Sequence, residues 1–410
     1  MINCNFAPNE RWDDAWLSFR LLFTPWKWLH GKDIKAASQK LSESFFPLYK
    51  TKLNFNFFLT GRSALYHLLH SLNLPAKSEV IVQAFTCEAV ILPILANNLT
   101  PVYIDIESQS FSMNPIELEK KITANTKAII LQYTFGITPT HIAKIKAIST
   151  KYKLMLIEDI AHGYNVSSQI KKNSKCIFVM SFGRSKALSS VFGGAIATSD
   201  QNLHNKLKSE SGKLKQPSRL FILRLLLYKP IAYVCKQTFD LVIGKIIHKL
   251  FFGTKILIPE ITDKEKEGLY DLQLDKAYPN ALAILLMHQI KKFKQMHKQR
   301  AKICQLYAKA INNNQFTISL SYLQAGNLSL LRFPLMTDNR QAIIRKGLQN
   351  HIYFGNWYTQ TVAPKSLKLD KVGYKQGICP VAESFCARII NLPTYITKQE
   401  ALKIMDVIAV

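Results

Sequence analysis

The sequence lacks the cysteine patterns that build metal sites and disulfide frameworks. It has seven cysteines, an odd number, and no C-x-x-C pair. They are scattered along the chain at Cys4, Cys87, Cys176, Cys235, Cys304, Cys379 and Cys386. Closely spaced cysteines hold zinc, and an even set at regular spacing indicates a disulfide-stapled secreted protein. We therefore predict no metal site and expect a protein of the reducing cytoplasm.

Long apolar runs are missing as well. No stretch of about 18 uncharged apolar residues occurs, so we predict no transmembrane helix. The start, Met1–Phe6, lacks a basic stretch followed by an apolar run, and we expect no secretory signal. No internal repeat or low-complexity tract is present. With 410 residues, 48% hydrophobic and 20% charged, the composition is globular and the length suits two domains with an extra segment.

Acidic residues are scarce. The 27 Asp and Glu stand against 54 Lys and Arg, which gives a formal net charge of +27. Such a charge can indicate nucleic acid, a membrane or an acidic substrate as partner. The bases are mostly lysines spread along the whole chain, whereas a surface that binds phosphates favours the planar fork of arginine. We therefore predict diffuse basicity and no specific nucleic-acid binding, with membrane association as the second interpretation.

Four segments differ in pattern. Residues 1–50 are aromatic and basic. Residues 51–212 alternate short, continuous apolar runs with helical patterns, as expected for strands buried on both faces of a parallel sheet. Residues 213–260 form a basic, hydrophobic helical insertion, and residues 261–410 contain a long helix and a smaller domain. The expected fold class is α/β, with a large domain built on a mostly parallel sheet flanked by helices and a small α+β C-terminal domain.

The insertion allows two interpretations. From Lys213 to Lys255 it carries nine basic residues and one acid, Asp240, with apolar residues between them. Basic amphipathic helices of this kind lie in membrane interfaces. Apolar faces at helical spacing more often pack on the protein's own core or on a second subunit. The packed interpretation is favoured, and the membrane interpretation stays open.

A carboxylate and an amine follow two successive predicted strands. Asp159 lies at the carboxyl end of the strand predicted over 154–157, where open α/β sheets bind ligands. Lys186 lies six residues beyond the apolar run that ends at Met180. Alone, the aspartate could cap a helix and the lysine could be a surface residue. Together they supply what pyridoxal phosphate (PLP) requires: an amine that forms a Schiff base and a carboxylate that holds the pyridinium nitrogen.

Further residues suit the same cofactor. The helical pattern after Gly61 and Arg62 places them at a helix N-terminus, where free N–H groups and the helix dipole favour a phosphate. Ser181, at the end of the strand before Lys186, offers a hydroxyl group to a phosphate. His162, three residues after Asp159, could contact the ring oxygen of PLP, although an isolated histidine is more often structural.

In their joint order these stretches resemble the DegT/StrS family of PLP-dependent sugar aminotransferases, within the fold type I aminotransferase superfamily. The resemblance covers about residues 55–200 and 280–408. Its motifs are Gly61–Leu65, Phe85-Thr86, Pro101–Ile106, Glu158-Asp159 with His162, Ser181-Phe182 with Lys186, Gly193-Gly194, Cys379–Glu383 and Asn391–Thr394.

The resemblance assigns a role to each candidate residue. It implies Lys186 as the Schiff-base lysine and proton shuttle, and Asp159 as the pyridinium partner. His162 would contact the ring oxygen. The phosphate would be held by Gly61, Arg62 and Ser181. At Cys87 the chain departs from the family, which usually has an aromatic residue there that stacks on the PLP ring.

The implied activity is transfer of an amino group from a donor, commonly glutamate, onto a nucleotide-linked keto-sugar for a surface glycan or a related glycan. Relatives that dehydrate sugars carry histidine in place of the lysine, so Lys186 favours amino transfer. A cytoplasmic homodimer is implied, with peripheral contact to the inner membrane face as a second expectation for residues 213–255. Two alternatives remain: a PLP-dependent enzyme acting on a membrane-associated or lipid-linked substrate, and a non-catalytic regulatory protein of the same fold.

Overall fold

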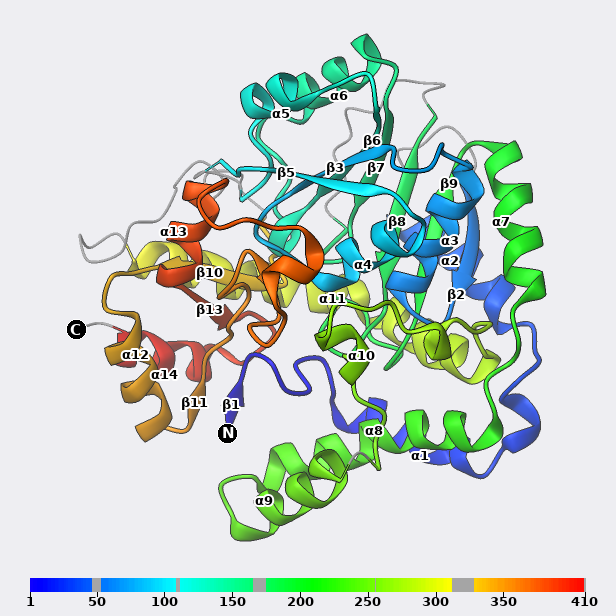
Figure 1. Ribbon diagram of the computed structural model, residues 1–410. Helices are drawn as coiled ribbons and strands as arrows, with labels where there is room; N and C mark the ends of the chain where they lie inside the picture. The colour runs from blue at the N-terminus through cyan, green and yellow to red at the C-terminus, as the bar shows by residue number, and fades with distance from the viewer. Residues whose placement is uncertain (46–52, 108–110, 165–174, 255, 312–327, 409–410) are drawn as a thin grey trace.

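The structure is a computed structural model (Figure 1), which describes residues 1–45, 53–107, 111–164, 175–254, 256–311 and 328–408. Its large domain contains a seven-stranded sheet. In spatial order the strands are β2 (Asn54–Phe58), β9 (Gly194–Thr198), β8 (Ile177–Ser181), β7 (Met155–Asp159), β6 (Thr126–Gln132), β3 (Glu79–Gln83) and β5 (Thr100–Ile104). Strand β9 is antiparallel to both of its neighbours, and every other pair is parallel. The predicted α/β class and mostly parallel sheet are confirmed.

The sheet is buried on both faces. In β3, Val80 and Val82 belong to one hydrophobic core while Ile81 belongs to the other. Side chains of successive residues alternate across a strand, so a strand covered on both sides reads as a continuous apolar run. The runs at 80–82, 102–104, 128–131, 154–157, 176–180 and 195–197 accordingly form strands. Strand β2 was not predicted, because Asn54 and Asn56 interrupt its apolar residues and it lies at the edge of the sheet.

Helices cover the two faces of the sheet. The core on one face includes residues of α3 (Gly61–Leu72), α4 (Glu88–Ala96) and α7 (Gln201–Lys213). The core on the other face includes residues of α1 (Trp12–Leu22), α2 (Asp33–Phe45), α5 (Pro115–Lys121), α6 (Ile142–Lys151), α8 (Arg219–Thr238) and the long α11 (Asn280–Ala310). The long helix predicted within residues 261–410 is therefore present as α11.

A smaller unit follows α11. It contains β10 (Arg332–Met336) paired antiparallel with β13 (Ile389–Pro393), together with α12 (Arg340–Gln349), α13 (Pro380–Arg388) and α14 (Lys398–Ile408). The N-terminus joins this unit, since β1 (Ile2–Asn3) pairs with β11 (Ile352–Tyr353). Strand β12 (Val362–Ala363) pairs with β4 (Thr86–Cys87) of the large domain. The chain therefore brings residues of both units together beside Cys87.

The described part of the insertion contains the helices α8 and α9 (Val242–His248), which pack on each other, and a π-helical turn over Lys249–Gly253. Helix α8 packs on α1 and buries Ile222, Leu225 and Leu226 in the core of the large domain. Helix α9 projects away from the body of the molecule (Figure 1). No described helix combines the length and apolar character needed to cross a membrane. The packed interpretation therefore holds for α8, while the four-segment division of the chain stays a prediction.

Candidate active site

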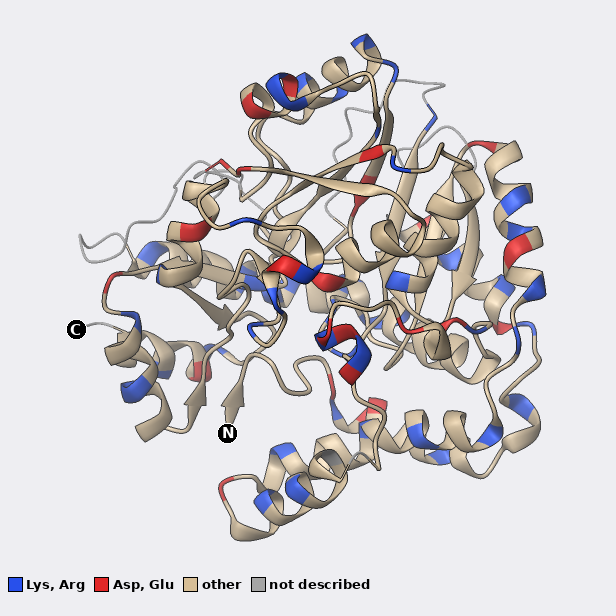
Figure 2. Ribbon diagram, viewed as in Figure 1, with Lys and Arg blue, Asp and Glu red and all other residues tan. Residues whose placement is uncertain are grey.

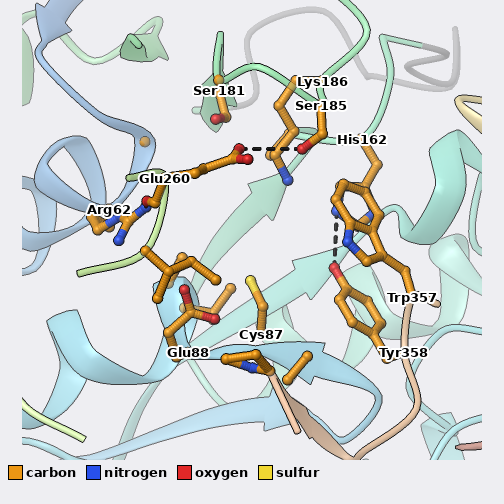
Figure 3. Close-up of a pocket in the computed structure, with 18 of the residues that line it drawn as sticks. Arg62, Cys87, Glu88, His162, Ser181, Ser185, Lys186, Glu260, Trp357 and Tyr358 are labelled. Carbon is orange, nitrogen blue, oxygen red and sulfur yellow. Dashed lines mark hydrogen bonds between the residues drawn. The ribbon is translucent and has the colours of Figure 1, made fainter. Parts of the chain in front are cut away.

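A cavity of about 410 Å³ lies at the carboxyl ends of the parallel strands. The last residues of β6, β7 and β8 line it, namely Gln132, Asp159 and Ser181. All seven residues predicted from the sequence line this one cavity: Gly61, Arg62, Cys87, Asp159, His162, Ser181 and Lys186. In Figure 3, Lys186 points into the cavity from one side, and Cys87 and Glu88 face it from the other. Parallel strands bring their carboxyl ends to one edge of a sheet, which explains the convergence.

Lys186 and Asp159 both line the cavity. Asp159 is buried, and its Oδ1 accepts a hydrogen bond of 3.0 Å from the backbone N–H of Ala161. Burial raises the pKa of Asp159, while the Ala161 N–H and the charge of Lys186 partly oppose that shift. The Nζ of Lys186 lies 4.8 Å from the centre of the Trp357 ring. The amine of Lys186 and the carboxylate of Asp159 thus line the same cavity, as the sequence predicted.

His162 is a neutral imidazole with a defined tautomer. Its Nδ1 accepts a hydrogen bond of 3.1 Å from the backbone N–H of Phe135, so the proton lies on Nε2. Nε2 lies 3.0 Å from the hydroxyl of Tyr358 and donates to it. Burial lowers the pKa of His162 well below its usual value, and the charges of Lys186 and Arg332 lower it further. Both ring nitrogens thus have protein partners, and a contact between His162 and the cofactor stays a prediction.

The first turn of α3 forms one end of the cavity. Thr60 caps this helix, because its Oγ1 accepts from the Ser63 N–H at 3.0 Å. The N–H groups that open a helix lack intrahelical acceptors, and the helix dipole is positive there. A Cβ atom at Gly61 would lie 3.1 Å from Oγ of Ser181, so glycine lets the start of α3 lie close to the Ser181 hydroxyl group. The N–H groups of α3 and this hydroxyl group together suit a phosphate.

Arg62 lies in an acidic environment that the sequence did not reveal. Its guanidinium forms an ion pair with the buried carboxylate of Glu265 and donates to the backbone oxygen of Glu260 at 2.6 Å. Burial alone would lower the pKa of Arg62, but Glu265 and Glu88 outweigh that effect and raise it. Burial raises the pKa of Glu88 to about 7, although Arg62 opposes the shift. The charge of Arg62 is therefore largely compensated within the protein.

An aromatic side chain from the small domain is a second unpredicted feature. Trp357 lines the cavity and stacks on His162, with ring centroids 4.9 Å apart and an interplanar angle of 20°. Cys87, where the family usually has its aromatic residue, lines the cavity too, and burial raises the pKa of its thiol to about 12. The thiol is therefore neutral. No local signal in the sequence links Trp357 to this site, whereas Glu88 directly follows Cys87 and could have been proposed.

The residues of the cavity fit PLP. Lys186 supplies an amine for its aldehyde, and the buried Asp159 supplies a carboxylate for its pyridine nitrogen. The N-terminus of α3 at Gly61 and the adjacent hydroxyl group of Ser181 line the cavity and can hold a phosphate. With these three features in one cavity, the protein can bind the cofactor. The amine can then move a proton to and from a substrate carbon.

Comparisons with known proteins agree with this geometry. The model of the DegT/DnrJ/EryC1/StrS aminotransferase family matches residues 53–218 and 278–409, so the segment that contains α8 and α9 falls outside the match. A similar curated protein is an uncharacterized protein of Methanocaldococcus jannaschii, 26% identical over 82% of this chain and 80% of that protein. Another is the UDP-N-acetyl-3-dehydro-alpha-D-glucosamine 3-aminotransferase of Acidithiobacillus ferrooxidans, 34% identical over 36% of this chain. That alignment spans 41% of the aminotransferase, less than half of its length.

Solved structures show the same fold. The Helicobacter pylori aminotransferase involved in pseudoaminic acid biosynthesis superposes with a TM-score of 0.72 and 19% identity, over 99% of this chain and 98% of that one. A DegT DnrJ EryC1 StrS aminotransferase from Brucella abortus gives a TM-score of 0.71 and 20% identity, over 97% and 95% of the two chains.

Proposed function

Because the chain belongs to the DegT/DnrJ/EryC1/StrS aminotransferase family, we propose that it is a PLP-dependent aminotransferase acting on a nucleotide-linked keto-sugar. Glutamate is the proposed amino donor, and a surface glycan or a related glycan is the proposed destination of the amino sugar. The convergence of Lys186 and Asp159 in one cavity carries the proposal. Relatives named as aminotransferases of UDP-linked and dTDP-linked sugars support the substrate class.

The cavity residues have distinct tasks in this reaction. PLP, when bound, supplies an electron sink for the carbon that loses its proton. Lys186 binds the cofactor through Nζ and, as a free amine, moves a proton to and from the substrate carbon. Asp159 holds a proton on the pyridine nitrogen, and the positive charge of that nitrogen offsets the burial of the carboxylate. Gly61, Arg62 and Ser181 hold the phosphate, with Arg62 also paired to Glu265.

A substrate screen tests the proposal. Purified protein loaded with PLP is incubated with glutamate and a panel of UDP-linked and dTDP-linked keto-sugars, and the products are analysed by mass spectrometry. We expect at least one keto-sugar to gain an amino group, while glutamate is converted to 2-oxoglutarate. Protein that stays colourless with PLP, or that aminates no member of the panel, contradicts the proposal. If the protein binds PLP but aminates no keto-sugar of the panel, the result favours the non-catalytic regulatory alternative.

We also propose a homodimer, as in the superfamily that the sequence resembles. Leu269 and Leu272 are exposed apolar side chains next to Tyr270, which stacks on Tyr66 of α3 with ring centroids 4.7 Å apart. Helix α3 begins at the wall of the cavity. Exposed apolar side chains next to this helix suit burial against a second subunit. Light scattering should then give twice the chain mass of 46.8 kDa. A monomer at micromolar concentration contradicts this.

A peripheral contact with the inner face of an anionic membrane is a further part of the proposal. We define the aromatic–basic face as the exposed apolar side chains of α1, α9 and their flanking turns: Trp12, Trp16, Phe19, Phe23, Trp26, Leu241, Val242, Ile243, Ile246 and Leu250. The rings of Trp12, Trp16, Phe19 and Phe23 form a row in which neighbouring ring centroids lie 5.2–5.9 Å apart. Such a row of exposed tryptophan and phenylalanine suits a membrane interface.

The charges of this face favour lipid over a second copy of the chain. Figure 2 shows Lys and Arg along α8 and α9, where acidic residues are sparse. Arg20, Lys27, Lys245 and Lys249 are exposed there. The acid within the insertion, Asp240, is already engaged by the N-terminal ammonium group at 2.9 Å. Two copies meeting through this face would bring like charges together, whereas an anionic leaflet attracts each lysine or arginine by about 1 kcal/mol.

Vesicle binding tests the membrane contact. We expect the protein to co-sediment with vesicles containing phosphatidylglycerol and not with pure phosphatidylcholine vesicles. Reversing two charges, Lys245→Glu and Lys249→Glu, should weaken binding about tenfold or more, since each contact contributes about 1 kcal/mol. The matched control reverses two exposed lysines elsewhere, Lys120→Glu and Lys153→Glu, and should bind nearly as the parent. Equal sedimentation with neutral and anionic vesicles would contradict the proposal.

A further inference from the structure

We propose that a second cavity, of about 170 Å³, binds a phosphate group outside the active site. It lies where the N-terminal segment, α8, α11 and the small domain meet (Figure 1). Three cations line it: Arg11 from the N-terminal segment, Lys236 from α8 and Arg300 from α11. Among the described residues, none lines both this cavity and the one that contains Lys186. The second cavity is therefore separate from the site proposed for PLP.

The ring of Tyr395 brings the two arginines of this cavity together. The Cζ of Arg11 lies 4.5 Å from the centre of that ring, and the Cζ of Arg300 lies 5.4 Å from the same centre. A guanidinium group has five N–H donors in a planar fork, which matches the oxygens of a phosphate. Two such groups beside one ring therefore present several donors to the same small space.

The three cations have no acidic partners in the described part of the chain. No carboxylate there forms an ion pair with Arg11, Lys236 or Arg300. Each of them instead donates to a backbone oxygen, namely that of Tyr395, Ala7 and Leu331 respectively. The acid that lines the cavity is Glu400, and its Oε2 already accepts from the N–H and the hydroxyl group of Thr397 at 2.8 and 2.9 Å. The positive charge of the cavity is therefore available to a ligand.

The cations of this cavity are destabilised by their surroundings. Burial and the charge of Arg11 lower the pKa of Lys236 to about 8, although Glu10 and Glu400 oppose the shift. Arg300 is 4% exposed, and burial lowers its pKa to about 10. Burial and neighbouring positive charges both disfavour the charged form of a base. An anion in the cavity favours that form, so its binding gains from cations that are already in place.

Charge and size identify the ligand group as a phosphate. The three cations and the single carboxylate of Glu400 leave a net charge of +2 on the cavity wall, which matches a phosphate dianion. Met1 also lines the cavity, but its ammonium group is paired with Asp240 at 2.9 Å. Guanidinium groups bind phosphate oxygens through strong, charge-assisted hydrogen bonds. The volume is less than half of the 410 Å³ of the active-site cavity, which suits a single phosphate group better than a nucleotide.

Two of the three cations lie in segments that the family model does not match. The match covers residues 53–218 and 278–409, which include Arg300 but neither Arg11 nor Lys236. Both segments lead into the aromatic–basic face, since Arg11 is followed by Trp12, and Leu241 follows shortly after α8. The phosphate group could therefore belong to a lipid headgroup or to a small soluble molecule, and the tests below distinguish these two sources.

Calorimetric titration with inorganic phosphate tests the soluble source. The protein is loaded with PLP first, so that the cofactor already fills the phosphate position proposed for the active site. For a soluble ligand, Lys236→Met should weaken phosphate binding about tenfold or more, because it removes a charged hydrogen-bond donor. The matched control is Lys215→Met, which replaces an exposed lysine of the same inserted segment outside the cavity and should bind phosphate as the parent does. A second variant guards against misfolding: Gln237→Glu adds a negative charge at an exposed residue of the cavity wall and should also weaken binding.

Co-sedimentation with vesicles tests the lipid source. The vesicles contain phosphatidylcholine and phosphatidic acid, whose headgroup is a phosphate monoester. If Lys236→Met and Gln237→Glu weaken vesicle binding more than Lys215→Met does, while the parent does not bind inorganic phosphate, the cavity takes a lipid headgroup. If inorganic phosphate binds and both variants weaken it, the cavity takes a small phosphorylated molecule. The proposal is overturned if the parent binds neither probe, or if both variants bind each probe as Lys215→Met does.

Discussion

Replacing Lys186 with alanine is expected to reduce amino transfer by about 10³-fold or more, since general acid–base catalysis alone contributes about 10²–10⁴-fold. The amine lies in a cavity with Asp159 and is placed to bind the cofactor and to move the substrate proton. Single-turnover mixing of PLP-loaded protein with glutamate measures the loss through the change in cofactor absorbance. A variant that retains parental rates would contradict both tasks assigned to Lys186.

The same variant should lose covalent attachment of the cofactor. Borohydride reduction of the PLP-loaded parent, followed by peptide mass spectrometry, should place the modification on Lys186. Lys365 is the matched control, because it also lines the cavity and is exposed. In a Lys365→Ala variant the modification should stay on Lys186, and in Lys186→Ala it should disappear. Modification of Lys365 in the parent would show that the sequence motif indicated the wrong amine.

The second large effect is on stability. Lys229 of α8 and Glu10 are both buried and lie 3.0 Å apart, and Ser189 also donates to Glu10 at 3.3 Å. Lys229→Met would leave the carboxylate of Glu10 buried without its counter-ion. Removing one partner of a buried ion pair destabilises a protein by about 3–5 kcal/mol. We expect chemical denaturation to show a loss of that order in the free energy of unfolding.

A double variant distinguishes the loss of the Lys229–Glu10 ion pair from the loss of packing around the Lys229 side chain. Glu10→Gln combined with Lys229→Met removes both charges and should recover most of the stability, since paired replacement of buried ions is often neutral. The exposed pair Lys151–Glu119 is the control, and Lys151→Met should leave the unfolding midpoint unchanged. If Lys229→Met is as stable as the parent, the insertion is not anchored in the core through this pair.

The burial of α8 helps to explain the basic, apolar pattern of the insertion. The same basic, apolar sequence suited both a packed helix and a membrane-facing one. The structure buries one side of α8 and leaves α9 exposed, with Val242 72% and Ile243 60% accessible. Periodicity alone could not separate the two helices, because both have apolar residues at helical spacing. What differs is the presence of α1 against α8, and that contact comes from a distant part of the chain.

Sequence patterns alone were enough to predict the fold class, most of the strands, and the site residues that lie at or shortly after strand ends. Asp159, Ser181 and Lys186 could be found because sheet geometry carries the ends of neighbouring parallel strands to one edge. Glu260, Arg332 and Trp357 reach the same cavity from segments with no local signal for it. Their positions in the cavity depend on how the small domain and the chain after the insertion pack against the sheet. Long-range packing places the acidic residues beside Arg62 and the ring of Trp357 in the cavity, and such packing leaves no periodic pattern in the sequence.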